Sequence, residues 1–589
     1  MENRVISACL AAALVVAPAG VRADERDFDD HRSQTATPIK HIVVIFQENV
    51  SFDHYFGTYP VAKNLAGETP FKASRDTPKS INTLLTPLDP NNHFAPLAGL
   101  DLINKNPNGP LGSGAAINGA NASNPIRLTP AQALTADQGH NYLPEQQAYN
   151  NGKMDSFPKY TGVGGTPAGF GTNLVMGYYD GNTVTAFWNY AQHFALSDNF
   201  WTTTFGPSTP GALNLISGQT NGFNASANVV DGSGHLLHAT HEVPDGQGNY
   251  TEIGDGDPLY DVCSTTTGDV VAMHGRNIGD LLNAQNITWG WFEGGFDLTV
   301  VNPDGSTGCA RQSTTTASGA LTFTSADYIP HHQPFQYYAS TRNSIHARPS
   351  STAAIGYSLI PHTTTPDPAN HQYDINDFYA ALAARNLPSV SFLKASGFED
   401  GHPGYSDPLD EQHFVVRVIN ALQKSANWDD TAVIIAYDDS DGWYDHQMPP
   451  IVDPSATAED ALNLANLCDN GVQQGRTTPT TPLKGSFGSP VQGRCGYGTR
   501  VPLLVVSPYA KANHVDHTLI DQSSIIRFIE DNWLSGQRIQ PGGSFDTIAG
   551  PLTNLFDFDK RDEYGPAKLI LDETTGVVTF VSRFNDDGR

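Results

Sequence analysis

Basic residues are scarce in this chain of 589 residues. Its 33 Lys and Arg stand against 61 Asp and Glu, so the formal net charge is −28. Such a charge repels phosphate backbones and anionic lipid surfaces outside any local basic site. We therefore expect no nucleic-acid partner and no affinity for anionic membranes.

Cysteine is equally rare, and none of the five cysteines belongs to a Cys-x-x-Cys pair. Zinc held by thiolates is therefore not expected. Cys9 lies in an N-terminal segment that we expect to be removed on export, which leaves Cys263, Cys309, Cys468 and Cys495. An even number in an exported chain indicates disulfides. Three connectivities are possible, and short loops favour Cys263 with Cys309 and Cys468 with Cys495.

The N-terminus has the apolar run that is typical of segments that direct a protein to export. Residues 5–18 are apolar after Arg4, and residues 21–23 form a small-x-small site. This pattern is typical of a secretory signal and is too short for a membrane anchor, with a buried N-terminal helix as the alternative. We expect residues 1–23 to be a signal peptide and residues 24–589 to be exported, to the periplasm or outside the cell.

Charged residues make up only 16% of the chain, whereas it has 55 Gly and 40 Pro. Long, turn-rich loops are therefore expected. Residues 61–135 lack a sustained period and predict an ordered surface excursion. Residues 220–325 predict hairpins and loops, including the short apolar piece 287–292.

Two apolar segments predict strands buried on both faces, and each ends in oxygen-bearing side chains. Residues 42–46 lead to Glu48 and Asn49, and residues 431–437 lead to Asp438 and Asp439. Glu48 and Asn49 could simply begin a turn. Adjacent carboxylates, however, repel each other unless a cation or a shared proton offsets them. Because ligands bind at the carboxyl ends of strands in open α/β sheets, the four residues predict one site for a divalent ion.

Further strands alternate with helices. Residues 389–393 and 501–508 predict buried strands, and residues 375–386 and 521–533 predict helices. Such alternation indicates an α/β fold with a mostly parallel sheet.

Ser208 stands where a Gly-Pro turn leads into a short helix, with Pro210 near the first helical position. There a hydroxyl meets the positive end of the helix dipole, which suits an oxygen that attacks phosphorus. A plain N-cap serine has the same pattern. A serine carboxyl esterase is not indicated, since Ser208 lacks the Gly-x-Ser-x-Gly elbow.

Four histidines occur in irregular segments. His140 lies in a loop, His331 and His332 lie between prolines, and His402 follows a predicted strand. Each could be an ordinary exposed histidine or a proton donor near a reacting group. Their positions alone leave both interpretations open.

Residues 48–57 read Glu-Asn-Val-Ser-Phe-Asp-His-Tyr-Phe-Gly, and this motif resembles the opening motif of the bacterial phosphoesterase family. That family contains phosphatidylcholine-hydrolysing phospholipases C and the acid phosphatase A group. The resemblance extends from about residue 40 to about residue 535. Residues 208–212, Ser-Thr-Pro-Gly-Ala, are similar to the acid phosphatase branch, whereas the phospholipases have Thr-Asn-Pro-Asn-Arg there.

The resemblance implies one catalytic domain over residues 24–589, an alkaline phosphatase-like three-layer sandwich with long loop insertions. It implies a secreted, metal-dependent acid phosphatase that acts through a phosphoserine on small phosphate esters. The alternative is a phospholipase C acting on phospholipid head groups at the same centre. A binding protein on a decayed enzyme scaffold is a third interpretation.

The family also implies roles for particular residues. Ser208 would be the nucleophile and a further ligand of a divalent ion of unknown identity, beside Glu48, Asn49, Asp438 and Asp439. The phosphate would be surrounded by His140, His331, His332 and His402. Asp445 and His446 are candidates to orient the ligands, and an acidic pH optimum is expected because histidine cations lose their charge above roughly pH 6.5.

Overall fold

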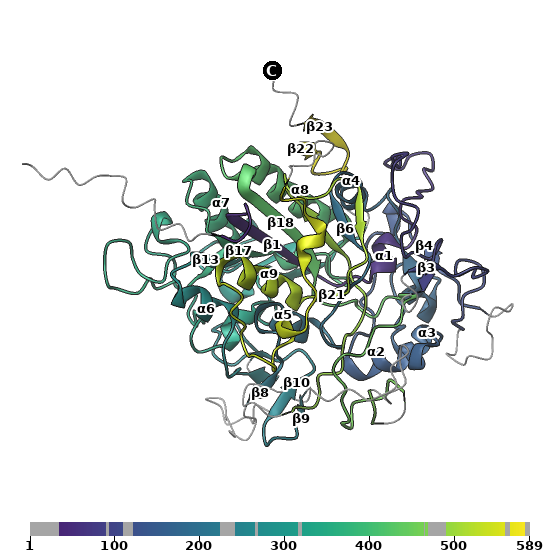
Figure 1. Cartoon of the computed structure of the whole chain (residues 1–589), viewed down its shortest axis with the longest axis horizontal. Helices are drawn as coiled ribbons and strands as arrows, with labels where there is room; N and C mark the ends of the chain where they lie inside the picture. The colour runs from purple at the N-terminus through teal and green to yellow at the C-terminus, as the bar shows by residue number, and fades with distance from the viewer. Residues whose placement is uncertain are drawn as a thin grey trace, which may run out of the picture. The chain divides into compact units, whose positions relative to one another are not determined.

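An eight-stranded sheet forms the centre of the fold (Figure 1). The computed structural model describes residues 35–89, 94–109, 122–223, 242–265, 269–315, 321–463, 466–468, 490–559 and 566–583. The expected signal peptide therefore lies outside the described residues. In spatial order the strands are β16 (Gln372–Asp374), β13 (Trp289–Glu293), β17 (Val390–Lys394), β1 (His41–Gln47), β18 (Thr431–Tyr437), β19 (Leu503–Val506), β6 (Ala195–Ser197) and β20 (His514–Asp516).

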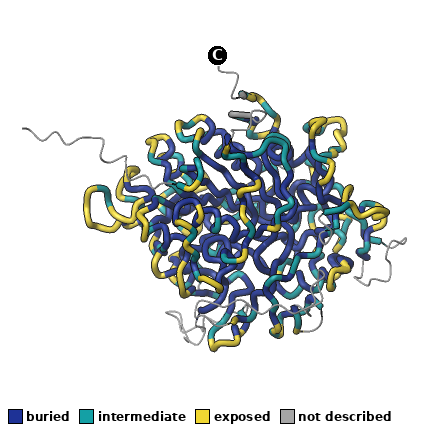
Figure 2. Tube along the Cα trace, in the orientation of Figure 1, coloured by how far each residue is buried: buried dark blue, intermediate teal, exposed yellow. Residues whose placement is uncertain are grey.

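The sheet is mostly parallel, as the sequence predicts. Among its described strands, only β19 runs opposite to its neighbours, β18 and β6. The central strands β1 and β18 pair in parallel over their whole length. Every residue of both strands is buried, and the interior of the fold is correspondingly dark blue in Figure 2. Burial on both faces is expected for a parallel sheet that is covered by helices.

Two groups of helices form the outer layers (Figure 1). α4 packs against α8, whereas α5 packs against α6 and α9. The helices are α1 (Phe52–Phe56), α2 (Tyr142–Tyr149), α3 (Phe157–Tyr160), α4 (Thr185–His193), α5 (Ser208–Ser217), α6 (Ile278–Ala284), α7 (Ile375–Ala383), α8 (Pro408–Lys424) and α9 (Ser523–Trp533). The α/β class is therefore confirmed. None of the helices among the described residues is both long and apolar enough to cross a bilayer.

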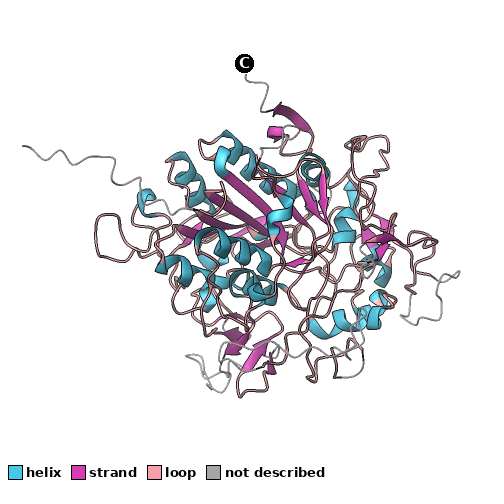
Figure 3. Cartoon of the chain, in the orientation of Figure 1, coloured by secondary structure: helices cyan, strands magenta, loops and turns pink. Residues whose placement is uncertain are grey.

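Loops and short strands occupy much of the remaining chain (Figure 3). The small sheets are β8 (Asn221–Phe223) with β10 (Tyr250–Glu252) and β9 (Glu242–Pro244), β11 (Asp257–Pro258) with β12 (Val270–Val271), β14 (Gln312–Thr314) with β15 (Thr324–Ala326), β2 (Leu88–Asp89) with β3 (Ala95–Pro96), β4 (Ile126–Arg127) with β5 (Gly177–Tyr178), β7 (Phe200–Trp201) with β21 (Ile520–Asp521), and β22 (Pro566–Leu571) with β23 (Val578–Arg583).

The prediction of only hairpins and loops over residues 220–325 is wrong. This segment contains α6 and also β13, which lies inside the central sheet between β16 and β17. All five residues of β13 are buried, but the piece reads Trp-Gly-Trp-Phe-Glu and lacks a run of β-branched residues. Its strand conformation is therefore imposed by the neighbouring strands rather than by local propensity.

Both expected disulfides are present, and the predicted pairing is confirmed. Cys263 pairs with Cys309 at a Cα–Cα distance of 5.2 Å, and Cys468 pairs with Cys495 at 5.8 Å. The first crosslinks the loops of the insertion that contains β11 and β14. Closing a loop of this kind stabilises the fold mainly by restricting the unfolded chain.

Candidate active site

The predicted ligands of the divalent ion meet at one edge of the sheet. Because β1 and β18 are parallel and Gln47 pairs with Tyr437, the residues after each strand arrive at the same level. The four side chains are at most 1% exposed: Glu48, Asn49, Asp438 and Asp439. The structure thus brings together two segments that are about 390 residues apart in the chain.

Ser208 lies at the same edge, as the first residue of α5. Its hydroxyl lies within hydrogen-bond distance of two acceptors, Glu48 Oε2 at 3.1 Å and Asp439 Oδ2 at 3.2 Å. Gly211 allows this approach, since a Cβ atom there would lie 2.2 Å from the main-chain oxygen of Asp438. Close packing of α5 against Asp438 therefore requires glycine at this position of the Ser-Thr-Pro-Gly-Ala segment.

This group of side chains fits a divalent cation. Both polar atoms of the Asn49 side chain and Asp438 Oδ2 lack a hydrogen-bond partner within the described part of the chain. A buried polar atom without a partner is costly, so such atoms commonly mark a ligand site. Three carboxylates and an amide oxygen are the donors that hard divalent ions prefer.

Two residues at this edge were not predicted from the sequence. Lys394 ends β17, and its Nζ forms an ion pair with Glu48 Oε1. Burial lowers the pKa of Lys394, although nearby carboxylates oppose this. Asp400 follows in the next loop, and burial raises its pKa to about 8 against the effect of Lys394. A charged residue that ends a buried strand beside β1 is the only sequence signal for Lys394.

A cavity of about 350 Å³ opens beside this edge. It is lined by three of the four predicted histidines and by seven other residues, most of them polar: Asp137, Gln138, Gly139, His140, Asn141, Asp255, Ile329, His331, His402 and Tyr405. The ring centroids of His140 and His402 are 6.0 Å apart. His140, His331 and His402 are therefore positioned around one space.

His332 lies elsewhere. It is 3% exposed and does not line the cavity, although its ring lies 4.6 Å from that of His331. Its Nδ1 is 3.4 Å from Glu48 Oε1 and 3.8 Å from Asp400 Oδ2, and its Nε2 lacks a partner within the described residues. His332 thus contacts the carboxylate group rather than the open space.

The surroundings shift the pKa values of the four histidines in different directions. Burial favours the neutral ring, but Asp439, Asp441 and Asp137 outweigh it at His140 and raise its pKa well above the usual value. His140 Nδ1 lies 3.2 Å from Asp441 Oδ1, a partner that the sequence did not reveal.

Burial is likewise outweighed at His331, where Asp257 and Asp255 raise the pKa. Its Nδ1 lies 3.3 Å from Asp257 Oδ1. Burial dominates at the other two histidines. It lowers the pKa of His402 to about 4 and lowers that of His332, where the charges of neighbouring histidines add to the effect.

Asp445 and His446 lie in a separate buried network. His446 Nδ1 is 2.6 Å from Asp53 Oδ2, and Arg500 Nη2 donates to Asp445 Oδ2 at 3.1 Å. Arg500 also stacks on Phe52, with its guanidinium carbon 4.3 Å from the ring centroid. This network connects α1, which follows Glu48 and Asn49, to the loop that follows Asp438 and Asp439.

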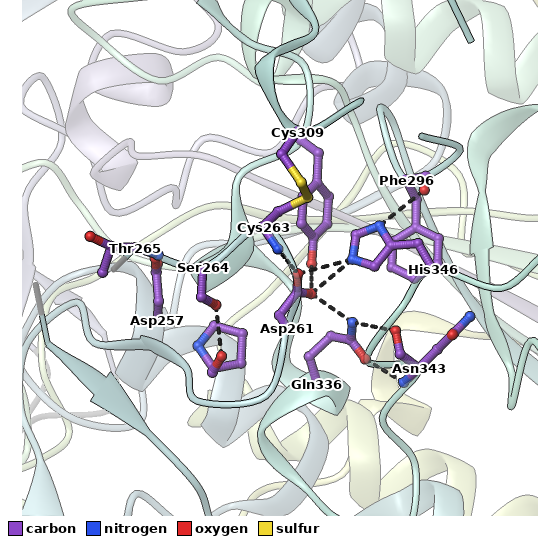
Figure 4. Close-up of a disulfide and its surroundings, with 12 residues drawn as sticks. Asp257, Asp261, Cys263, Ser264, Thr265, Phe296, Cys309, Gln336, Asn343 and His346 are labelled. Carbon is purple, nitrogen blue, oxygen red and sulfur yellow. Dashed lines mark hydrogen bonds and ion pairs between the residues drawn. A yellow bond between two sulfur atoms is a disulfide. The ribbon is translucent and has the colours of Figure 1, made fainter. Parts of the chain in front are cut away.

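Another polar cluster lies beside the disulfide of Cys263 (Figure 4). Asp261 accepts hydrogen bonds from the Tyr328 hydroxyl and the Gln336 amide, both at 2.6 Å, and lies 3.0 Å from His346 Nε2. His346 Nδ1 faces the Phe296 carbonyl at 3.1 Å. Asp261, Cys263 and His346 are close enough to suggest a metal site, but Cys263 has no free thiolate because it is in the disulfide.

The phosphoesterase family model matches residues 39–534. A non-hemolytic phospholipase C of Pseudomonas aeruginosa is 31% identical over 182 residues, which cover 30% of this chain and 24% of that protein. A hemolytic phospholipase C of the same organism is 22% identical, over 90% of this chain and 57% of that protein. The chain therefore matches less than two thirds of the length of these relatives.

Phospholipase C A of Mycobacterium tuberculosis is 24% identical over 89% of this chain and 78% of its own length. Among solved structures, the alkaline phosphatase PafA aligns with 63% of this chain and 94% of that chain, at 10% identity and a TM-score of 0.29. Murine ectonucleotide pyrophosphatase/phosphodiesterase 5 aligns with 64% and 95%, at 10% identity and a TM-score of 0.27.

Proposed function

Because the chain belongs to the phosphoesterase family, we propose that it is an exported, metal-dependent acid phosphatase that hydrolyses phosphate monoesters through a phosphoserine at Ser208. One observation carries the proposal. The Ser208 hydroxyl is held between Glu48 and Asp439 at the start of α5, next to a cavity lined by histidines.

The position of Ser208 suits attack on phosphorus. Glu48 and Asp439 both lie within hydrogen-bond distance of its hydroxyl, whose one hydrogen can be donated to either carboxylate, so they orient the oxygen and favour loss of its proton. Ser208 is the first residue of α5, so the positive end of the helix dipole lies at its hydroxyl and would favour an anionic phosphate there. The phosphoserine would then be hydrolysed by water in a second step.

Glu48, Asn49, Asp438 and Asp439 would hold the divalent ion, with Ser208 beside it. When bound, such an ion lowers the pKa of a hydroxyl and offsets negative charge on phosphoryl oxygens. The uncompensated polar atoms of Asn49 and Asp438 support this assignment.

The histidines that line the cavity would have two different roles toward the phosphate. The raised pKa values of His140 and His331 favour their cationic forms, which offset charge on the phosphoryl oxygens and can protonate the leaving alkoxide. His402 is neutral above about pH 4 and would contribute hydrogen bonds instead of charge. The proposed acidic optimum therefore extends toward neutral pH.

A second candidate is a phospholipase C that cleaves phosphodiesters at the same centre. It is favoured by the relatives, since the proteins similar to this chain carry that name. The Ser-Thr-Pro-Gly-Ala segment at residues 208–212 favours the phosphomonoesterase, because it is similar to the acid phosphatase branch of the family.

A panel of two chromogenic substrates, each with and without a chelator, tests the proposal. We expect p-nitrophenyl phosphate to be hydrolysed faster than p-nitrophenyl phosphorylcholine at pH 6, and both reactions to stop on chelation. A higher kcat/KM for the diester would establish the second candidate. No turnover of either substrate with metal present would favour a binding protein.

A further inference from the structure

We infer that Glu145 is a positioning residue of the proposed reaction, because it joins the turn that leads to Ser208 to the loop that contains Asp439. The inference rests on the proposed phosphatase function and names a residue that acts through Ser208 rather than on the substrate. Glu145 lies in the first turn of α2, is 1% exposed and does not line the cavity.

The two oxygens of the Glu145 carboxylate accept hydrogen bonds from different segments. Oε2 accepts a bond at 3.0 Å from the backbone N–H of Gly206, two residues before Ser208. Oε1 accepts a bond at 2.8 Å from the hydroxyl of Ser440, the residue after Asp439. One side chain therefore connects two segments that are more than 200 residues apart in the chain.

The turn before Ser208 needs such an acceptor. Gly206 is buried and has a φ of +116°, a backbone conformation that favours glycine. A buried N–H group without a partner is costly, so the turn is stable in this conformation when Glu145 accepts the Gly206 N–H. Glu145 thereby fixes the backbone from which the Ser208 hydroxyl reaches Glu48 and Asp439.

The loop that contains Asp439 is fixed by the same carboxylate. Ser440 is buried, and its hydroxyl donates to Glu145. In the preceding residue, Asp439 Oδ2 lies 3.2 Å from the Ser208 hydroxyl. Loss of either bond to Glu145 thus removes a constraint on one member of the pair formed by Ser208 and Asp439. Because rates depend steeply on the placement of the reacting groups, a displacement of about 1 Å can lower the rate roughly a hundredfold.

The test measures kcat/KM for p-nitrophenyl phosphate in metal-loaded variants. Glu145→Leu keeps a side chain of similar size without acceptors and should lower kcat/KM about a hundredfold. Glu145→Gln should stay within about tenfold of the parent, because the amide oxygen can accept from Gly206 and the amide N–H can donate to Ser440 Oγ. This rescue separates positioning from a role that needs the negative charge.

Ser440→Ala removes one of the two bonds and should also lower kcat/KM. Combined with Glu145→Leu it should cause little further loss, since the effects of two residues that act through one contact do not add. Ser455→Ala is the matched control, because Ser455 is also buried and its hydroxyl donates to another buried carboxylate, Asp460 Oδ2, at 2.6 Å. Asp460 contacts α2 through the Tyr142 hydroxyl, so this variant probes the same helix. It should leave kcat/KM unchanged, and thermal unfolding verifies the fold of each variant.

Full activity of Glu145→Leu, or a Glu145→Gln variant as slow as Glu145→Leu, would overturn the inference and leave the phosphatase standing. Losses from Glu145→Leu and Ser440→Ala that multiply in the double variant would show separate roles and also overturn it. If Glu145→Leu does not fold, equal kcat/KM in Ser440→Ala and Ser455→Ala would overturn the inference instead. A parent protein that turns over no phosphate ester would overturn the proposed function and the inference with it.

Discussion

Two buried polar clusters differ in how completely their hydrogen bonds are satisfied. At the carboxyl edge of the sheet, Asn49 and Asp438 keep polar atoms without partners among the described residues. In the cluster beside the first disulfide, both oxygens of Asp261 and both nitrogens of His346 have partners (Figure 4). The first arrangement leaves polar atoms that a ligand could bind, and the second leaves none on Asp261 or His346.

The contrast shows why residue type alone does not define a site. Asp261 and His346 are as buried and as close together as the residues of the active edge. They are placed there to fix the loops around Tyr328, three residues before His331. A polar cluster serves binding where its own geometry leaves donors or acceptors unused, and serves the fold where it uses them all.

The largest effect is expected from a change at the carboxyl edge of the sheet that leaves the cluster around Asp261 intact. Ser208→Ala should reduce turnover of p-nitrophenyl phosphate at least about a thousandfold, because the covalent step needs the hydroxyl. Its fold should survive, since one hydroxyl contributes little to stability. Circular dichroism and thermal unfolding serve as the control. A variant that retains more than roughly a tenth of the parent activity would assign the attack to a water molecule instead.

The next prediction concerns metal content. Glu48→Gln and Asp438→Asn should each bind a divalent ion at least about tenfold more weakly, since each loses a negative charge that offsets the ion. Elemental analysis after dialysis measures this directly. Asp261→Asn, from the satisfied cluster, should keep the metal content of the parent. Full metal content in both ligand variants would refute the assigned ligand set.

That Glu48, Asn49, Asp438 and Asp439 lie together could be predicted because the signal is local. Each of the two central strands is a short apolar run followed directly by oxygen-bearing residues, and parallel strands bring their carboxyl ends together. Lys394 and Asp400 could not be predicted in the same way. Their role depends on β17 lying next to β1, which neither segment specifies on its own.

The positions of the histidines likewise depend on tertiary contacts that the sequence does not reveal. His331 and His332 are adjacent in the sequence, yet one lines the cavity and the other contacts Glu48. Their directions follow from the 3-10 turn over Pro330–His332 and from the surrounding loops, which the sequence pattern does not reveal. The partners that raise the pKa values of His331 and His140, Asp257 and Asp441, come from distant segments for the same reason.

The satisfied cluster yields the third prediction. Asp261→Ala should destabilise the protein by about 3 kcal/mol or more, because Tyr328, Gln336 and His346 each lose a buried acceptor. Urea unfolding of the metal-loaded protein measures the change. Asp76→Ala, an exposed carboxylate, should remain within about 0.5 kcal/mol of the parent. Equal stability of the Asp261 and Asp76 variants would show that this cluster is not the support that we describe.

The smallest effect is a pH dependence at a buried histidine far from the proposed ligands in the chain. His371 stacks on Trp289 with ring centroids 4.3 Å apart, its Nδ1 is 2.9 Å from the Trp289 carbonyl, and its Nε2 is 3.0 Å from the Ser358 hydroxyl. In the neutral ring the Nδ1–H donates to the Trp289 carbonyl. Burial, partly opposed by the bond to Trp289, lowers the pKa of His371 to about 4.

The sign of the effect follows from that lowered pKa. Between about pH 6.5 and pH 4 the unfolded chain binds a proton at His371 that the folded chain does not, so stability is fully present above pH 6.5 and falls as the pH decreases. The loss from this group is at most about 1.4 kcal/mol for each pH unit in that window. The difference in unfolding free energy between the parent and His371→Gln, measured from pH 7 to pH 4.5, should therefore change with pH in favour of the variant. His362→Gln changes an exposed histidine and is the control, for which no such trend is expected. If the stabilities of the parent and of His371→Gln changed with pH in parallel, the prediction that His371 stays neutral in the folded protein would be wrong.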